Sequence, residues 1–411
     1  MRSSKLARKL LRVENTVLTA VTSELDGSGT EVLVLHVRPD RRLARRCPEC
    51  GRPCPRYDKG KRRRWRHLDA CAMPVAVEAD APRIRCPEHG VKVAAVPWAR
   101  HDSGFTRAFE DTVTWLCASM ADSNVAEYMR IEWRTVQAIV TRVVAELDGK
   151  TDRLTGVRRA GIDELAYRKG QRYIMIAVDH DTGRLIWASE GRNQDTVRKF
   201  FDALGEDRSK QLTAVTADGA AWIHDVIRDR APQAKICLDA FHAVVWATEA
   251  LEKLRRRISA ALKADGQAGL EPGARWALLK DQQKLSPGQR ATLASLQKVN
   301  GPLFRGYLMK EQLRDVFKAK KDGGAALLAG LLSWCSRSRI PEFVKLGQTL
   351  RTYRQLILNA LELGLSNARV EATNTHLRAL TKRANGYHSP DALIARANLT
   401  RGGLCPPLPG R

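Results

Sequence analysis

The stretch that decides the fold is Val157-Arg-Arg-Ala-Gly-Ile-Asp-Glu164, followed shortly by Tyr173-Ile-Met-Ile-Ala-Val-Asp179. Both segments are of strand length, the second is a nearly continuous apolar run, and each lies next to turn residues, so each predicts a β-strand. A third strand is predicted over residues 184–189, after the turn Asp181-Thr-Gly183. Three strands this close together in the sequence predict antiparallel neighbours in one sheet.

The chain then alternates between helical and strand patterns. A helix is predicted over residues 193–204, a strand over 212–217, a helix through 228, a strand over 235–239 and a long helix over 241–263. Antiparallel strands followed by helix–strand–helix–strand–helix indicate a layered α/β fold of the RNase-H-like type.

Two acidic residues stand where such a fold carries chemistry. Asp163 lies on the first strand, and Asp218 ends the fourth, at the carboxyl edge where α/β sheets bind ligands. Clustered carboxylates can hold two Mg²⁺ or Mn²⁺ ions about 4 Å apart for phosphodiester cleavage. A single Asp at a strand end is more often a turn or cap residue. Because Glu164 neighbours Asp163 on a strand, only one of the two can face such a site.

A predicted helix over residues 366–383 offers a further carboxylate. Glu371, Asn374, Arg378 and Lys382 follow at three- and four-residue steps, which places them on one helical face. A carboxylate heading a basic stripe suits a metal ion held beside a phosphate backbone. The alternative is an ordinary solvated face.

Asp239-Ala-Phe-His242 places a carboxylate and an imidazole three residues apart, either to support the site or to cap the following helix. Residues 250–350 are helical and charged, and they predict an all-helical insertion between the strands and the helix that carries Glu371. Trp276 and Trp334 lie in this region. We interpret them as core residues in preference to base-stacking groups.

Two cysteine-containing motifs near the start predict a zinc site. Cys47-Pro-Glu-Cys50-Gly51 and Cys86-Pro-Glu-His89-Gly90 together supply four ligands for a tetrahedral ion. A buried reduced pair or a redox Cys-x-x-Cys are the alternatives, and the redox interpretation lacks the expected βαβ setting. Cys54 and Cys71 could compete for a ligand position. A basic loop with an interleaved tryptophan, Lys59-Gly-Lys-Arg-Arg-Arg-Trp-Arg66, is predicted between the motifs, either for phosphate contact or simply as a solvated loop.

Residues 106–147 predict three helices. Apolar positions recur at helical spacing over residues 109–120, a short helix follows over 122–129, and a longer one begins near 135. A short helix, a tight turn and a longer helix indicate a helix-turn-helix, in which Arg134, Gln137 and Arg142 would reach DNA. A plain three-helix packing unit is the alternative.

The composition favours a polyanionic partner. The chain of 411 residues has 70 Lys+Arg against 45 Asp+Glu, a net charge of +25, and 44% hydrophobic residues. Such an excess favours DNA or RNA through counterion release. No apolar run reaches the roughly 18 residues of a membrane span, and no secretory signal is apparent, so a cytosolic, nucleoid-associated location is expected.

In this order and spacing, the motifs resemble the ISL-three (ISL3) family of insertion-sequence transposases. The resemblance rests on the Cys47 motif, the helix-turn-helix, Ile162-Asp-Glu164, Asp218, Asp239-Ala-Phe-His242, Arg275-Trp-Ala-Leu-Leu-Lys280 and Ser366-Asn-Ala-Arg-Val-Glu371 with Asn374. It implies an RNase-H-like DDE nuclease with Asp163, Asp218 and Glu371 as the metal-binding triad and Asp239 and His242 as auxiliary residues. The second zinc pair departs from the usual family pattern, in which two cysteines are more widely spaced, and this leaves His101 or Cys71 as substitute ligands.

The expected organisation is therefore a zinc module at 1–103, a helix-turn-helix at 104–150, the first part of the core at 151–263, a helical insertion at 264–350 and the rest of the core at 351–411. The expected protein is a DDE transposase that binds the inverted ends of its element, cuts DNA with Mg²⁺ and joins the 3′ hydroxyl to target DNA. Arg378 and Lys382 would hold the nearby strand, and a homodimer or larger assembly would bring two ends together. The alternative is a DNA-binding regulator with an inactive nuclease-like core.

Overall fold

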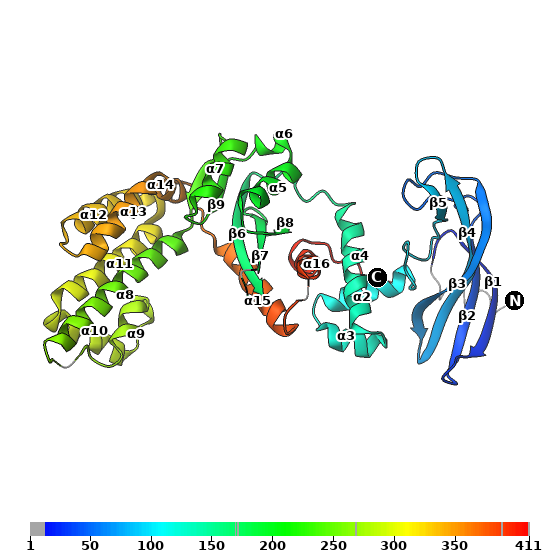
Figure 1. Cartoon of the computed structure of the whole chain (residues 1–411), viewed down its shortest axis with the longest axis horizontal. Helices are drawn as coiled ribbons and strands as arrows, with labels where there is room; N and C mark the ends of the chain where they lie inside the picture. The colour runs from blue at the N-terminus through cyan, green and yellow to red at the C-terminus, as the bar shows by residue number, and fades with distance from the viewer. Residues whose placement is uncertain (1–12, 169, 171, 268, 388, 410–411) are drawn as a thin grey trace. The chain divides into compact units, whose positions relative to one another are not determined.

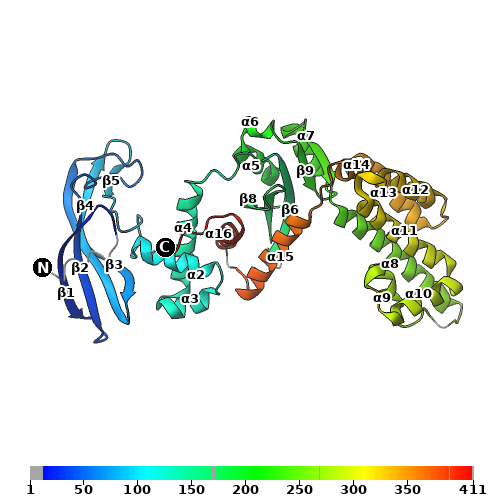
Figure 2. The same ribbon diagram turned by 180° about the vertical axis from the view of Figure 1, so that it is seen from behind.

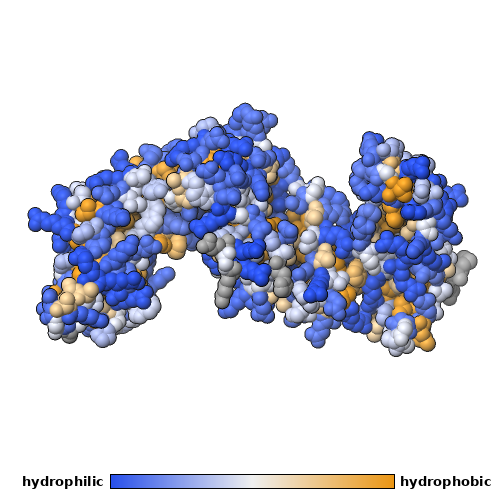
Figure 3. Space-filling model, in the orientation of Figure 1, coloured by the Kyte–Doolittle hydropathy of each residue, from blue (hydrophilic) through white to orange (hydrophobic). Residues whose placement is uncertain are grey.

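The computed structural model describes residues 13–168, 170, 172–267, 269–387 and 389–409 of the chain. The chain divides into two compact units: unit 1 is Met1–Lys150 with Leu404–Arg411, and unit 2 is Thr151–Gly403. Within the described ranges, no helix is long and apolar enough to cross a membrane. On the face drawn in Figure 3, hydrophilic residues predominate and hydrophobic ones form smaller separate areas.

Unit 1 begins with a five-stranded sheet (Figure 1). Its strands are β1 (Thr16–Leu25), β2 (Glu31–Pro39), β3 (Arg56–Ala70), β4 (Met73–Cys86) and β5 (Gly90–Val93). The order is β1-β2-β4-β3, and β5 pairs with β4. β1 and β2 form an antiparallel hairpin, with Leu25 opposite Glu31. Asp26 shapes the turn, because its Oδ1 accepts hydrogen bonds from the backbone N–H of Ser28 at 2.8 Å and of Thr30 at 3.0 Å.

The basic stretch at residues 59–66 lies in strand β3, so its prediction as a loop is wrong. The reason is Trp65, whose buried side chain lies opposite Val77 of β4 and packs edge-on against Trp98 with ring centroids 5.5 Å apart. Pairing with β4 and one aromatic anchor are enough to hold the cationic residues in a strand. β3 is an edge strand of the sheet, and charged side chains on an edge strand also disfavour pairing with other chains.

Three helices complete most of unit 1: α2 (Arg107–Cys117), α3 (Asp122–Met129) and α4 (Trp133–Asp148). Thr106 begins α2 by accepting a hydrogen bond from the backbone N–H of Phe109 at 3.3 Å. Arg130 ends α3 in the left-handed conformation, with φ 54°, and this makes the tight turn into α4. α4 begins at Trp133, two residues before the predicted start.

Unit 2 contains a second five-stranded sheet. Its strands are β6 (Arg159–Arg168), β7 (Arg172–Asp179), β8 (Leu185–Glu190), β9 (Ala214–Ala217) and β10 (Lys235–Leu238), and their order is β10-β9-β6-β7-β8. The pairs β6–β7 and β7–β8 are antiparallel, whereas β9 is parallel to both β6 and β10. All five strands and the helices between them match the predicted elements within a few residues, except the short helix at Glu206–Ser209, which was not predicted.

Helices cover both faces of this sheet (Figures 1 and 2). They are α5 (Gln194–Leu204), the short α6 (Glu206–Ser209), α7 (Ala221–Arg230), α15 (Ala368–Arg383) and α16 (Pro390–Arg401). Along β7, Met175 and Ala177 join the core with α5 and α7, whereas Ile174, Ile176 and Val178 join the core with α15 and α16. A strand buried on both faces has a continuous apolar sequence, which is why β7 is easily predicted.

The remainder of unit 2 is helical. It comprises α8 (Ala240–Ala264), α9 (Ala274–Leu279), the 3₁₀ turn η1 (Gln282–Lys284), α10 (Pro287–Val299), α11 (Gly301–Ala319), the 3₁₀ turn η2 (Lys320–Asp322), α12 (Gly324–Arg337), α13 (Pro341–Thr352) and α14 (Arg354–Leu363). These helices share one apolar core. Trp334 packs against it, as predicted, but the prediction that Trp276 is a core residue is wrong, because this residue is 63% exposed.

Candidate functional site

Asp163 faces helix α15 from strand β6. The side chains of Leu165 and Tyr167, two and four residues later on the same side of the strand, join the core under α15. Asn374 of α15 donates a hydrogen bond from Nδ2 to Asp163 Oδ2 at 2.6 Å. Burial raises the pKa of Asp163 to about 6, and the nearby carboxylates of Asp239 and Asp218 add to this shift. Glu164 forms an ion pair with Arg192 instead.

Asp218 and Asp239 follow the adjacent parallel strands β9 and β10, so both lie at the carboxyl edge of the sheet. Asp218 Oδ1 accepts a hydrogen bond from the backbone N–H of Ala220 at 3.0 Å. Asp239 caps α8 by accepting from the backbone N–H of Phe241 at 3.0 Å, and its other oxygen lies 3.0 Å from His242 Nδ1. Asp239 therefore caps the helix, one of the two sequence interpretations, and also contacts His242, while its support of the site stays a prediction. The hydrogen bond that His242 donates to Asp239 raises the pKa of His242.

Glu371 lies in the first turn of α15, and burial, with the charge of Asp239, raises its pKa. The start of α15 is held against the sheet by a buried chain of contacts. His180 Nε2 lies 2.7 Å from Thr216 Oγ1, and that hydroxyl donates to Asn367 Oδ1. Close approach also requires Gly161 on β6, where an added Cβ would collide with Val370 of α15.

The acids share one region without forming one tight group. Asp163 interacts electrostatically with Asp218, Asp239 and His242, and Glu371 interacts with Asp239 and His242. The ligand oxygens of Asp163, Asp218 and Glu371 do not all lie within 4.8 Å of one another; in the described ranges only the cysteine–histidine group below meets that limit. A site for two ions about 4 Å apart does not require such closeness, because ligands of opposite ions lie farther apart.

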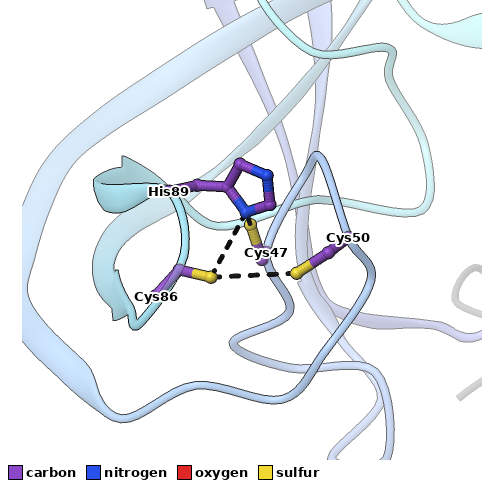
Figure 4. A group of neighbouring side chains, drawn as sticks. All are labelled: Cys47, Cys50, Cys86 and His89. Carbon is purple, nitrogen blue, oxygen red and sulfur yellow. Dashed lines mark hydrogen bonds between the residues drawn. The ribbon is translucent and has the colours of Figure 1, made fainter.

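Cys47, Cys50, Cys86 and His89 form the compact group, with ligand atoms within 4.8 Å of one another (Figure 4). Cys50 Sγ lies 3.7 Å from Cys86 Sγ, and His89 Nδ1 lies 3.5 Å from Cys86 Sγ and 3.8 Å from Cys47 Sγ. Zinc–sulfur bonds of about 2.3 Å in a tetrahedron place sulfurs about 3.8 Å apart, so the donor set fits this ion. Gly51 and Gly90 follow the two pairs at φ of +71° and +69°, which permits the tight turns.

The other zinc ligands considered from the sequence do not belong to this group of four. Cys71 is exposed, and His101 Nε2 lies 3.7 Å from Asp102 Oδ2. Cys54 is buried in the same small core as Cys47 and Cys86, and burial raises the pKa of its thiol.

The residues predicted to contact DNA differ in their exposure and in their contacts within the protein. Arg134, at the start of α4, is exposed, with its Cζ 5.3 Å from the ring centroid of Trp133. Gln137 is half-buried and donates to Asp122 Oδ2 at 3.5 Å. Arg142 is held by Glu110, with Nε 3.1 Å from Oε1, and by a hydrogen bond to the Asp102 carbonyl. On α15, the side chains of Arg378 and Lys382 are exposed beyond Glu371.

Sequence reasoning missed the contact between Asn374 and Asp163. The spacing placed Asn374 on the Glu371 face, but it could not identify a partner 211 positions away. Asn367 could be predicted only as a cap of α15, and Thr216 and His180 gave no signal, because the contacts among the three exist only once α15 packs on the sheet.

Three family models match the chain in order. They describe the zinc-finger of transposase IS204/IS1001/IS1096/IS1165 over residues 44–89, the helix-turn-helix domain of transposase family ISL3 over 94–144, and an ISL3 transposase domain over 160–397. The transposase for insertion sequence element IS1557 of Mycobacterium tuberculosis, in strains CDC 1551 / Oshkosh and H37Rv, is 45% identical over 438 aligned positions, which cover 100% of this chain and 98% of the relative. The transposase for insertion sequence element IS1001 of Bordetella parapertussis is 24% identical and covers 87% of this chain and 89% of its own length. The chain belongs to the ISL3 family of insertion-sequence transposases.

Proposed function

We propose that this transposase is a DDE enzyme whose core, residues 151–263 and 351–411, is RNase-H-like and is interrupted by a helical insertion at 264–350. The observation that carries the proposal is the junction of α15 with β6. There, a helix that follows the insertion supplies Glu371 and, one turn later, binds Asp163 directly through Asn374. The strand order and the mixed pairing of the sheet are what such a core requires.

Asp163, Asp218 and Glu371 are the residues that would hold two Mg²⁺ or Mn²⁺ ions, because hard cations prefer carboxylate oxygens. Such ions supply activation of the attacking oxygen and stabilisation of the leaving oxygen in DNA cleavage and strand transfer. The donor set fits, since Asp163 lies near the carboxylates of Asp218 and Asp239 and Glu371 near that of Asp239, and burial together with these charges raises the pKa values of Asp163 and Glu371. A bound cation would relieve the repulsion between these carboxylates.

The other residues hold the acids and the DNA. Asp239 would orient His242 beside the carboxylates through their 3.0 Å contact, as auxiliary groups. Arg378 and Lys382 extend along α15 beyond Glu371 and would bind the phosphates of the strand being cut. Residues 1–103 and 104–150 would recognise the terminal inverted repeats, with Arg134 as the most exposed of the three predicted contacts on α4. Cys47, Cys50, Cys86 and His89 would bind structural Zn²⁺, and a homodimer or larger assembly would join two ends.

The test compares three single variants, Asp163→Asn, Asp218→Asn and Glu371→Gln, on a duplex that carries one element end. Each should bind the duplex like the unchanged protein, yet cleave it roughly a thousandfold more slowly in Mg²⁺, because one ion ligand is lost. Asp195→Asn, on an exposed position of α5, is the control and should cleave normally. Full Mg²⁺-dependent cleavage by any of the three variants would show that the triad is wrong.

A further inference from the structure

An exposed tryptophan stands out on helix α9 of unit 2. Trp276 is 63% exposed, whereas Ala274, Ala277 and Leu278 of the same short helix are buried. Tryptophan is usually well buried in a folded chain. α9 therefore packs through its alanine and leucine side chains and leaves the indole facing outward.

One arginine lies over this indole, and it shares a carboxylate with two more. The Cζ atom of Arg275 lies 5.2 Å from the Trp276 ring centroid, and its Nε lies 3.6 Å from Glu252 Oε1 on α8. Arg255 and Arg256 bind the same carboxylate, at 2.8 and 3.1 Å. Three guanidinium groups thus share one carboxylate, and the side chains of Arg256 and Arg275 are 70% and 50% exposed. We call Arg255, Arg256, Arg275 and Trp276 the arginine–tryptophan patch; its excess of positive charge suits a polyanion.

A buried lysine fixes the helix that presents the patch. Lys310 of α11 is fully buried, and its Nζ donates to the carbonyls of Leu278 at 2.6 Å and Lys280 at 3.1 Å. It also lies 2.7 Å from Glu311 Oε1. A buried ammonium is costly unless it is paired, and here it satisfies carbonyls at the end of α9. Because α9 is held in place, Trp276 loses little conformational freedom when it binds a ligand.

We propose that the arginine–tryptophan patch binds a DNA strand that carries an unpaired base, with the arginines on phosphates and the Trp276 indole stacked on the base. In a duplex, neighbouring base pairs cover both faces of each base, so an indole can stack only on a base that is unpaired or at an end. The Cζ atom of Arg275 lies over the indole ring, and the 63% exposure of Trp276 leaves surface for this contact. This inference rests on one part of the proposed function, namely that the protein binds DNA.

The test measures binding of the full-length protein to a paired duplex and to the same duplex with one unpaired 2-aminopurine. Stacking contributes enough that Trp276→Ala should lose roughly tenfold in affinity for the unpaired duplex, with little change for the paired one. Trp276→Phe should keep most of the preference. Arg256→Gln should weaken binding to both duplexes and reduce the slope of log affinity against log salt by about one. Quenching of 2-aminopurine fluorescence should accompany binding and disappear in Trp276→Ala.

Two controls match these variants within the helical segment. Val299→Ala removes an 82% exposed apolar side chain, and Arg337→Gln removes an exposed arginine on α12; both should bind like the unchanged protein. An unchanged preference in Trp276→Ala would overturn the proposal. So would a change of oligomeric state with unchanged DNA binding, which would identify a second copy of the chain as the occupant. Asp163→Asn should keep the preference for the duplex with the unpaired base while it loses cleavage. A failure of the proposed triad can therefore be told apart from a failure of the stacking proposal.

Discussion

At the scale of single residues, Asn374 joins helix α15 to Asp163 on strand β6. Its side chain is 3% exposed, its Nδ2 donates to Asp163 at 2.6 Å, and its Oδ1 has no hydrogen-bond partner among the described residues. Asn374→Ala should slow cleavage roughly tenfold to a hundredfold, because a buried hydrogen bond to a charged group contributes about 1.5–3 kcal/mol. Single-turnover cleavage of an end-containing duplex measures this effect.

The same variant needs a control for folding. Thr375→Ala, on an exposed neighbouring position of α15, should leave both the cleavage rate and the melting temperature unchanged. If Asn374→Ala cleaves at the normal rate while remaining folded, Asn374 does not position Asp163. DNA affinity should be the same in all three proteins, since Asn374 is buried.

Contacts between residues far apart in the chain, such as Asn374 and Asp163, could not be predicted from the sequence. The spacing of Glu371 and Asn374 placed both on one helical face, which was enough to select the helix. The partner of Asn374 lies 211 positions away and meets it only when the chain folds back, and no local pattern predicts that contact. Asp163 and Asp218 could be proposed from the sequence because a strand end is a local feature.

At the scale of elements, periodic patterns predict structure correctly where burial is one-sided or complete. β7 and α4 have unambiguous apolar periods, and both lie within a few residues of their predicted bounds. The prediction for β3 is wrong because most side chains of residues 59–66 are cationic and Trp65 is the buried one. A strand that is stabilised mainly by pairing with its neighbour shows no clear pattern of apolar residues in its sequence. The prediction for Trp276 is wrong because composition cannot say which side of a short helix is covered.

Helix α4 is joined to the rest of unit 1 by Glu146, which gives an element-scale prediction. Burial by itself raises the pKa of Glu146, but hydrogen bonds from Lys150 and Arg107 and the charge of Arg100 outweigh it and bring the pKa to about 2. Because this folded-state pKa is depressed, the carboxylate stabilises α4 above pH ~4.5 and the effect is lost as the pH falls toward ~2. The loss should be at most about 3 kcal/mol.

Hydrogen exchange of the α4 backbone amides, followed from pH 6 to 3, measures this loss. Glu146→Gln should show weaker protection at pH 6 and less change with pH, because the titrating group is absent. Equal pH dependence in the two proteins would show that the ion pairs of Glu146 do not stabilise the helix. Amides of β7, in the other unit, serve as the internal reference.

At the scale of the whole molecule, the net charge of +25 correctly indicated a nucleic-acid partner, yet it did not show where the partner binds. Many cations are engaged within the protein: Arg62 and Arg64 bind Glu78, and Arg100 binds three carboxylates. Arg100 is buried among its carboxylates whereas Arg134 and Arg378 are exposed, and only the three-dimensional structure reveals this difference. The sequence therefore predicted the class of ligand better than the binding surface.

Because the proposed zinc ligands lie in unit 1 and the proposed catalytic acids in unit 2, we expect recognition and cleavage to be separable. Cys86→Ser should release the bound zinc, measurable by atomic absorption, and lower discrimination between element-end and unrelated duplexes by roughly a hundredfold or more. Mn²⁺ binding at the acids, followed by calorimetry, should be unchanged. Cys71→Ser, on an exposed cysteine outside the cluster, is the matched control and should keep both zinc and discrimination. If Cys86→Ser keeps full discrimination after losing its zinc, the cysteine–histidine group does not contribute to end recognition. If the variant also loses Mn²⁺ binding, the two units are not independent.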